Sequence, residues 1–388
     1  MKKIIYINSV DRQEVSGQGS FERNFLSFLE SSSSEAEVKV FTINPSKNII
    51  TDKYISLKLN KSSKLSYLFY QINIFYFLIK EIRKNKKCTI YIRLAPFNLS
   101  PFIIAGFFKI KITARSGPIY QNLSLYNKVN NVFLLRVFKC FLNYYYKKTQ
   151  DIIVVTEKIK ELLIRDFNLN PSKIHVVSNP INNTIFEGEV DGESIRKKIN
   201  IDSTEKIIGF VGDVYKDQGV QHIFKALSLI RENNAINKIK VVIVGTGTYL
   251  ADCKRIVKEL ELEDNVIFLG RIKPNEVFEY ISTFNICLAP FTKTDYEVKG
   301  SSALKILEYL YCNKPVITID VLEYKFIKEN NFGYLYETDN LIDLSEKMLL
   351  ALNFNDKIMS KEFVKKNYSK EKTFSKYLKI INSSYDVK

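Results

Sequence analysis

The stretch Gly300-Ser-Ser-Ala-Leu-Lys-Ile-Leu-Glu-Tyr-Leu-Tyr-Cys-Asn-Lys-Pro-Val-Ile317 joins a helix start, an amphipathic helix and the beginning of a buried strand. Small residues at a helix start let an anion approach the first-turn amides, which have no partners inside the helix. Lys305 adds a full positive charge one turn later, and Glu308 lies near the same helix face. The stretch therefore predicts a phosphate-binding helix tip beside a carboxylate. An ordinary capped helix with a surface lysine and glutamate is the alternative.

Short apolar runs alternate with helical patterns on both sides of this stretch. The runs are Ile4–Ile7, Val38–Ile43, Thr89–Ile92, Lys111–Ala114, Ile152–Val155 and Ile174–Val177, then Ile207–Val211, Ile239–Val244, Val266–Leu269, Ile286–Ala289 and Pro315–Thr318. Continuous apolar strands between amphipathic helices are typical of parallel sheets that are covered on both faces. The sequence therefore predicts an α/β fold.

One polar segment, Asn182–Ser194, breaks the alternation and contains two glycines, so we interpret it as an interdomain linker. The 388 residues suffice for two domains, at about 100–200 residues per domain. We expect two doubly wound, Rossmann-like domains that face a cleft, over residues 1–190 and 195–366. Residues 367–388 are expected to form a helix that packs back on the first domain.

Composition excludes several classes of protein. The five cysteines are odd in number and widely spaced, and only two histidines occur, so we expect no disulfide framework, no metal site and no cofactor. The N-terminus turns polar too soon for a signal peptide, and no apolar run reaches the roughly 18–20 residues of a membrane span. We therefore expect a cytoplasmic protein.

Two strand–glycine turns precede the quoted stretch, Ile207-Ile-Gly-Phe-Val-Gly-Asp213 and Val241-Val-Ile-Val-Gly-Thr-Gly247. Their order, followed by Leu-Lys-x-x-Glu-Tyr and Lys-Pro-Val-Ile, resembles the retaining GT-B glycosyltransferases of family four (glycosyl transferases group 1). Gly17-Gln-Gly-Ser-Phe-Glu-Arg23 resembles the glycine-rich first loop of that family. Asp151–Thr156 and Lys173–Pro180 resemble the end of its acceptor domain. The resemblance covers nearly the whole chain and is strongest over residues 207–320.

The resemblance implies the GT-B fold and metal-independent transfer, with retention, of a sugar from a nucleotide-diphosphate donor to a glycan or lipid-linked acceptor in surface polysaccharide synthesis. By resemblance the first domain binds the acceptor and the second binds the nucleotide sugar. Glu308 is expected to bind ribose, and Lys305 and Arg115 complete the catalytic candidates. The donor-binding candidates are Gly17, Gly19, Gly212, Lys216, Gln218, Gly245, Arg271, Ser301, Ser302, Ala303 and Leu304.

The chain departs from the family pattern at three positions. Gly300 stands where the first glutamate of the Glu-x7-Glu motif is expected, and Asp213 and Gln218 replace the Arg and Lys that grip the diphosphate. We expect Lys305, together with Lys216, to supply the missing positive charge. Arg115 is expected to enter the cleft where the family has a catalytic histidine. A surface residue among many basic ones is the alternative for Arg115.

Other functions share part of this pattern. A dinucleotide-binding oxidoreductase needs a third glycine that Gly245-Thr-Gly-Thr-Tyr-Leu lacks, and no Walker A sequence occurs. A nucleotide-sugar epimerase with the GT-B fold and a catalytically degenerate GT-B protein stay open as alternatives. The basic, aromatic first half also suits a nucleic-acid-binding protein, but no recognisable binding motif accompanies the charge, and we expect no nucleic acid partner.

The positive charge is concentrated in one segment. Between Lys61 and Gln150 there are 16 basic residues and a single acid, Glu81. The apolar, aromatic runs Leu65–Ile79 and Val132–Tyr146 are each followed by lysines. Apolar area flanked by Lys and Arg is what an interfacial helix needs, so we predict peripheral docking on an anionic membrane surface. Core helices with solvated basic ends are the alternative.

Overall fold

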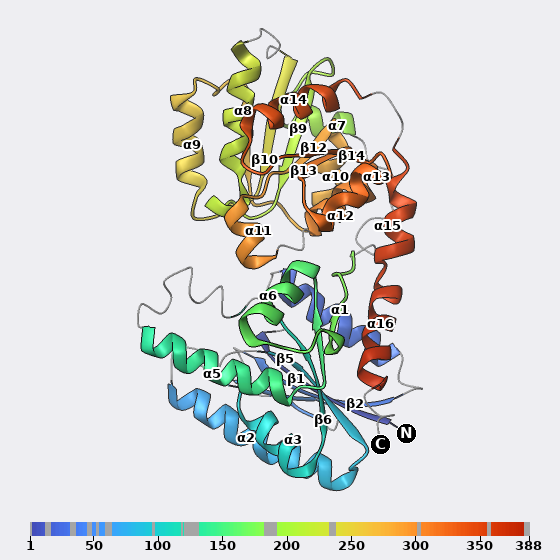
Figure 1. Cartoon of the computed structure of the whole chain (residues 1–388). Coiled ribbons are helices and arrows are strands. Elements are labelled where there is room, and N and C mark those ends of the chain that lie inside the picture. Colours follow the sequence, from blue (N-terminus) through green and yellow to red (C-terminus); the bar gives the residue numbers. More distant parts are fainter. Residues whose placement is uncertain are drawn as a thin grey trace. The chain divides into compact units, whose positions relative to one another are not determined.

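A computed structural model describes residues 2–11, 17–31, 36–44, 49–51, 54–58, 64–94, 98–117, 119, 132–181, 192–232, 238–300, 304–354 and 358–383. The chain divides into two compact units (Figure 1). The first consists of Met1–Pro180, Val298–Gly300 and Lys370–Lys388, and the second of Ile181–Glu297 and Ser301–Ser369.

The first unit contains an eight-stranded sheet in the order β3-β4-β2-β1-β5-β6-β7-β8. The strands are β1 Lys2–Asp11, β2 Ala36–Asn44, β3 Ile49–Ile50, β4 Tyr54–Lys58, β5 Cys88–Arg93, β6 Lys111–Arg115, β7 Asp151–Val154 and β8 Ile174–Val176. Every pairing is parallel except that of the short edge strand β3 with β4. All six apolar runs that were predicted in this half lie at strands of the sheet.

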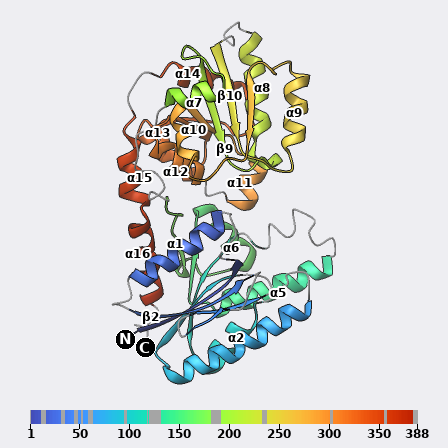
Figure 2. The same ribbon diagram turned by 180° about the vertical axis from the view of Figure 1, so that it is seen from behind.

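Helices cover both faces of this sheet. They are α1 Gly17–Ser31, α2 Lys64–Lys84, α3 Ser100–Phe108, α5 Val132–Lys148, α6 Glu157–Phe167 and α16 Lys370–Ser383. Alternate residues of β1 enter two different cores, because successive side chains of a strand point to opposite faces. Ile5 and Ile7 pack with residues of α2, α3, α5 and α6, whereas Ile4 and Tyr6 pack with α1 and α16. Figure 2 shows α16 running beside α1.

The second unit contains a fully parallel six-stranded sheet in the order β11-β10-β9-β12-β13-β14. The strands are β9 Lys206–Val211, β10 Ile239–Val244, β11 Val266–Gly270, β12 Ile286–Ala289, β13 Val316–Ile319 and β14 Gly333–Tyr336. Its helices are α7 Gly192–Lys198, α8 Val220–Glu232, α9 Leu250–Glu259, α10 Val277–Thr283, α11 Lys293–Lys299, α12 Leu304–Tyr311, α13 Lys325–Glu329, α14 Leu341–Leu352 and α15 Ser360–Tyr368. The predicted α/β class with two Rossmann-like units is confirmed. The cleft between them stays a prediction.

The predicted linker Asn182–Ser194 lies mostly outside the described residues. The prediction is wrong at its end, because Gly192 begins helix α7. Ile195 and Ile199 of this region are buried in the core of the second unit. The last three residues of the predicted linker, Gly192–Ser194, therefore form the first turn of a helix that contacts α10.

In each sheet the first strands of the unit are added on one side of a starting strand and the later strands on its other side, so the starting strand is a topological switch point. β1 lies between β2 and β5, and β9 lies between β10 and β12. In open parallel sheets, ligands bind outside the carboxyl ends of the strands at such switch points. A ligand site in the second unit is therefore expected at the carboxyl ends of β9 and β12, at Val211 and Ala289.

A buried ion pair ties α2 to the first sheet. The ammonium group of Lys3 on β1 lies 2.6 Å from the carboxylate of Glu81, and the two residues are 1% and 5% exposed. Burial favours the neutral form of Glu81, but hydrogen bonds from Lys3 and Lys84 outweigh it and lower its pKa. A carboxyl with a lowered pKa stabilises the fold above its unfolded pKa of about 4.3, and this contribution disappears as the pH falls.

We predict that Glu81→Gln destabilises the first unit by about 3–5 kcal/mol at neutral pH, because it leaves the buried Lys3 charge without its nearest carboxylate. Urea unfolding at pH 7 measures the loss. The matched control is Lys84→Ala, which removes the exposed partner of the same carboxylate and is expected to cost about 1 kcal/mol or less. Equal losses in the two variants would contradict this account of the Lys3–Glu81 pair.

Candidate functional site

The N-terminus of α12 lies over the switch point of the second sheet. Tyr309 of this helix is fully buried. The N–H of Val211, at the end of β9, donates a 2.8 Å hydrogen bond to the Tyr309 hydroxyl oxygen. The hydroxyl in turn donates to the carbonyl oxygen of Leu288 on β12, at 3.3 Å. One side chain therefore fixes α12 against the two strands that flank the switch point.

Lys305 projects from the first turn of α12 toward the end of β9. Its ammonium group donates a 2.9 Å hydrogen bond to the side-chain oxygen of Gln218 and lies 4.2 Å from the ring centre of Phe210. It also lies 3.0 Å from the position that a Cβ would occupy on Gly212. The ammonium group of Lys305 therefore lies beside the turn that Gly212 forms, next to a neutral amide.

Gly212 and Gly245 form turns after the adjacent strands β9 and β10. Their φ angles are +142° and +141°, which disfavour residues with a Cβ. A Cβ on Gly245 would lie 1.8 Å from the carbonyl oxygen of Gly212. Gly245 is therefore required for the close approach of the two turns, and the missing side chain on Gly212 leaves room for the Lys305 ammonium group.

Glu308 follows Lys305 by one turn and is half-buried. Burial raises its pKa, and the Lys305 charge acts in the opposite direction. The carboxylate makes no hydrogen bond to any residue that the structure describes. Keeping a partly desolvated carboxylate without such partners costs stability, and groups of this kind are often found at functional sites.

The remaining donor-binding candidates lie in several places. Gln218 belongs, with the exposed Lys216, to the 3-10 turn η3 (Lys216–Gln218), while Leu304 begins α12. Arg271 is exposed just after β11. Ser301, Ser302 and Ala303 are outside the described residues. Gly17 and Gly19 lie in the first turn of α1, where a loop was expected, so that local prediction was wrong.

Arg115 lies in a different unit, at the carboxyl end of β6. Its guanidinium group lies 3.4 Å from the buried carboxylate of Glu22, donates a 2.7 Å hydrogen bond to Asn179 and stacks 3.6 Å from the Phe21 ring. Arg93, at the end of β5, contacts the same Glu22 oxygen at 3.0 Å. The side chain of Arg115 is 11% exposed, so the alternative of a surface residue is wrong. Its catalytic role stays a prediction.

Sequence analysis missed Glu22, Arg93 and Asn179 as members of this network. Glu22 lies inside the quoted Gly17–Arg23 motif, and Arg93 is the last residue of β5. Arg93 could have been identified from the sequence as a charged residue at the end of a buried parallel strand, since such ends gather at one edge of the sheet. The pairing with Glu22 could not be read from spacing, because these residues are far apart in the chain.

Gly300 has a structural reason to be glycine. Its φ is +55°, and its carbonyl oxygen accepts a 2.8 Å hydrogen bond from the Thr156 hydroxyl. A Cβ there would lie 2.8 Å from the side chain of Ile159, which is buried in the core of the first unit. A glutamate at this position would need the packing on α6 to change, which accounts for the departure from the Glu-x7-Glu pattern.

Two further findings concern metal binding and membrane spanning. No group of three or more His, Cys, Asp or Glu side chains that could hold a metal ion occurs among the described residues. Within the same residues, no helix combines the length and the apolar character that crossing a bilayer requires. The expected independence from a metal stays a prediction.

Comparison with known proteins supports the resemblance. Residues 191–370 match the family model described as Glycosyl transferases group 1. The poly(ribitol-phosphate) alpha-N-acetylglucosaminyltransferase of Staphylococcus aureus is 28% identical over 194 residues, which are 46% of this chain and 36% of that protein. The alpha-monoglucosyldiacylglycerol synthase of Streptococcus pneumoniae is 28% identical over 207 residues, which are 52% of this chain and 44% of that protein. The matches thus span less than half the length of these two relatives.

The fold extends the comparison to the whole chain. A glycosyltransferase from Rickettsia africae superposes with a TM-score of 0.75 at 16% identity and covers 100% of this chain and 99% of its own. At that identity the likeness establishes the fold. The chain therefore has the GT-B fold of two Rossmann-like units, and its residues 191–370 match the model of the Glycosyl transferases group 1 family.

Proposed function

We propose that the chain is a glycosyltransferase that takes a sugar from a nucleotide-diphosphate donor. The observation that carries the proposal is the convergence of Lys305, Glu308 and the first turn of α12 at the carboxyl ends of β9 and β12. This place combines the first turn of a helix, whose amides have no partner inside the helix, with a positive charge and a carboxylate. A diphosphate suits the first two, and the hydroxyl groups of a ribose suit the third.

Sugar transfer is faster when the site stabilises the departing nucleoside diphosphate. The bond between the anomeric carbon and the diphosphate oxygen breaks, the acceptor oxygen bonds to that carbon and loses its proton, and the nucleoside diphosphate departs with an added negative charge. Lys305 and the helix amides stand where this charge develops, which lowers the transition-state energy more than the ground-state energy. Retention of anomeric configuration and independence from a metal are parts of the proposal.

The acceptor is proposed to be a saccharide or lipid-linked saccharide in surface polysaccharide synthesis. Support comes from the names of two relatives, of which one adds a sugar to poly(ribitol-phosphate) and the other makes a glucosyldiacylglycerol. A nucleotide-sugar epimerase or an inactive GT-B protein would share the fold. A glycosyltransferase moves the sugar to an acceptor, whereas an epimerase rearranges the donor and an inactive protein does neither. Product analysis therefore separates the three.

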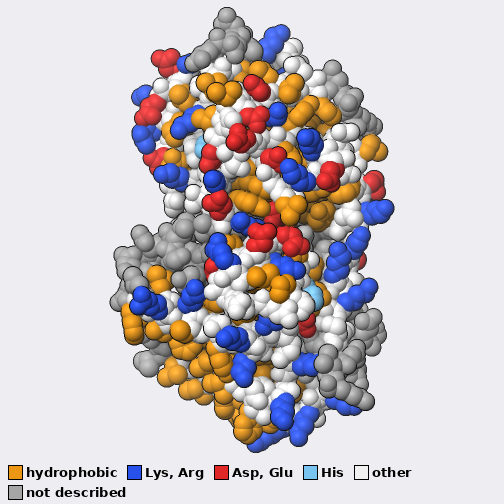
Figure 3. Space-filling view, viewed as in Figure 1, with side chains coloured by type: hydrophobic (Ala, Val, Ile, Leu, Met, Phe, Trp, Pro, Cys, Tyr) orange, Lys and Arg blue, Asp and Glu red, His pale blue; other side chains and the backbone are white. Residues whose placement is uncertain are grey.

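The proposed location is the cytoplasmic face of an anionic membrane, bound peripherally. Ten large apolar side chains are 38–81% exposed on α2, α3 and α5 of the first unit: Leu68, Phe69, Ile72, Phe75, Tyr76, Ile103, Phe107, Phe133, Leu134 and Tyr144. Figure 3 shows hydrophobic side chains gathered over this part of the first unit. Basic residues end α2 and α5. Apolar area beside Lys and Arg is the pattern of an interfacial surface.

We predict that the purified chain turns over at least one member of a panel of nucleotide sugars in the presence of EDTA, and that Glu308→Gln lowers this activity tenfold or more. Loss of a charged hydrogen bond costs about 1.5–3 kcal/mol. Product analysis by mass spectrometry measures turnover. Abolition by EDTA with rescue by magnesium would overturn the metal-independent mechanism.

Glu346→Gln is the matched control, because Glu346 is an exposed carboxylate of the same unit, on α14. It should leave turnover unchanged. A well-folded Glu308→Gln protein with the activity of this control would remove Glu308 from the site.

We predict that Lys305→Ala lowers kcat by about tenfold or more, whereas Lys216→Ala has a smaller effect. Lys305 is held beside Gly212 by Gln218 and Phe210, but Lys216 is exposed on η3. A positioned charge stabilises the departing diphosphate more than a mobile one. Steady-state kinetics with the accepted donor measures both variants. Equal and mild effects would count against Lys305 as the main cation.

We predict that the chain sediments with anionic vesicles and not with neutral ones, and that binding falls as salt rises. Each basic residue near an anionic surface contributes about 1 kcal/mol, and this attraction is screened within about 10 Å at 0.1 M salt. Co-sedimentation with both vesicle types at two salt concentrations measures it. Absent or equal binding in all four conditions would refute membrane docking without affecting the proposed sugar transfer.

A further inference from the structure

Helix α5 borders two adjoining depressions on the surface of the first unit. The first is a groove of about 710 Å³ with apolar walls. Leu99, Phe133, Val137, Phe141 and Tyr144 line it, and its polar margin is formed by Arg136 and Cys140. The volume lies in the range of small-molecule sites, which are mostly apolar with a few placed polar groups.

The second depression, of about 550 Å³, is lined mainly by polar and basic side chains. It shares Arg136 and Cys140 with the apolar groove. Lys139, Lys147 and Arg165 add further positive charges to its lining. The two depressions therefore meet along one edge of α5, with an apolar side and a cationic side.

The charge balance at this edge favours an anion. α5 carries no acidic residue. Asp166 also lines the second depression, but it pairs with Arg165 at 2.7 Å. Arg136 forms no ion pair with any residue in the described part of the chain. Its planar guanidinium group can bind a phosphate with two parallel hydrogen bonds.

We propose that α5 binds a single amphiphile that has a long hydrocarbon chain and a phosphate head. The chain occupies the groove beside Phe133, Val137 and Phe141, and the phosphate lies against Arg136. One molecule can reach both depressions, because Arg136 and Cys140 line the two of them. This binding does not depend on sugar transfer.

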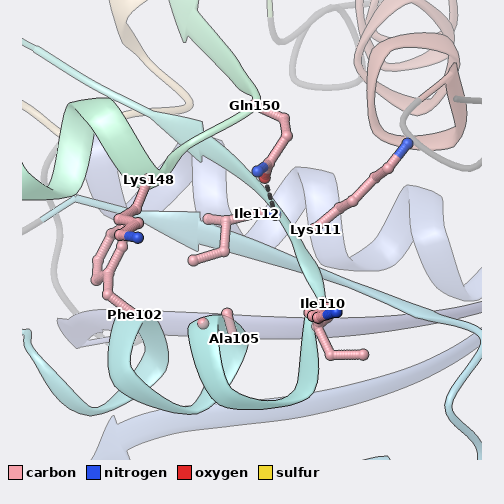
Figure 4. Close-up of a pocket in the computed structure, with 9 residues that line it drawn as sticks. Phe102, Ala105, Ile110, Lys111, Ile112, Lys148 and Gln150 are labelled. Carbon is pink, nitrogen blue, oxygen red and sulfur yellow. Dashed lines mark hydrogen bonds between the residues drawn. The ribbon is translucent and has the colours of Figure 1, made fainter.

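A third pocket, of about 320 Å³, does not offer such a site. Lys109, Lys111 and Lys148 line it together with Phe102 and Gln150. In Figure 4, Lys111 points away from Lys148, and Gln150 is held by its hydrogen bond from the N–H of Ile112. Lys111 and Lys148 do not converge on one anion, which favours the α5 edge as the phosphate position.

Cys140 makes the proposal testable in the unmodified protein. It is exposed and lines both depressions. Cys88, Cys253 and Cys287 are buried, and burial raises the pKa of Cys88 to about 11 and that of Cys253 to about 12. Burial also raises the pKa of the half-buried Cys312 to about 12. Because the thiolate is the reactive form, alkylation should be fastest at Cys140.

The experiment measures the rate of maleimide alkylation at Cys140 by peptide mass spectrometry. Dodecyl phosphate, kept below its critical micelle concentration, is compared with inorganic phosphate and with a neutral dodecyl ether of ethylene glycol. At ten times its Kd, dodecyl phosphate should slow the reaction about tenfold. The neutral dodecyl ether should protect less, and inorganic phosphate should leave the rate unchanged. The rate at Cys312 should stay constant and so exclude a global effect.

Arg136→Gln should reduce the advantage of dodecyl phosphate over the neutral ether by about tenfold, because a charged hydrogen bond is lost. The control variant Lys366→Gln, at an exposed lysine of α15, should leave this advantage unchanged. An unchanged Cys140 rate, equal protection by the two amphiphiles, or protection by inorganic phosphate alone would overturn the proposal. A protein that shows the predicted protection but transfers no sugar would overturn the proposed function and leave this inference standing.

Discussion

The hydroxyl group of Tyr309 is the contact on which the candidate site depends. It accepts from the Val211 N–H and donates to the Leu288 carbonyl, so that α12 is fixed to β9 and β12 where the two strands end. Both backbone groups are thereby satisfied at a buried strand end, where an unpaired donor costs about 1–3 kcal/mol. The positions of Lys305 and Glu308, on the same helix, follow from this anchoring.

The two units place charge at strand ends in opposite ways. In the first unit, Arg93 and Arg115 end neighbouring strands and both contact the carboxylate of the buried Glu22. In the second unit, Lys305 donates to a neutral amide and Glu308 has no hydrogen bond among the described residues. A charge that is already paired holds a fold together, whereas a charge facing a neutral partner can respond to a ligand. The proposed donor site lies in the second unit.

Sequence reasoning succeeded where periodicity alone decides structure and failed where distant contacts decide it. The long apolar runs predicted eleven strand positions that the structure contains, but β3, β4 and β14 were missed because their runs are short or mixed with polar residues. Gly192 was taken for a linker because the burial of Ile195 is a tertiary effect. The Glu22 partnership of Arg115 and the packing of Gly300 on Ile159 likewise join residues far apart in the chain.

The central claim is that a nucleoside diphosphate binds at the tip of α12, and hydrogen exchange tests it most directly. First-turn amides of a helix have no intrahelical acceptor and exchange quickly until a ligand occupies them. With saturating uridine or guanosine diphosphate, the account predicts slower exchange in peptides that cover residues 211–219 and 304–308. Unchanged exchange in both segments, or slowing confined to peptides of the first unit, would contradict it.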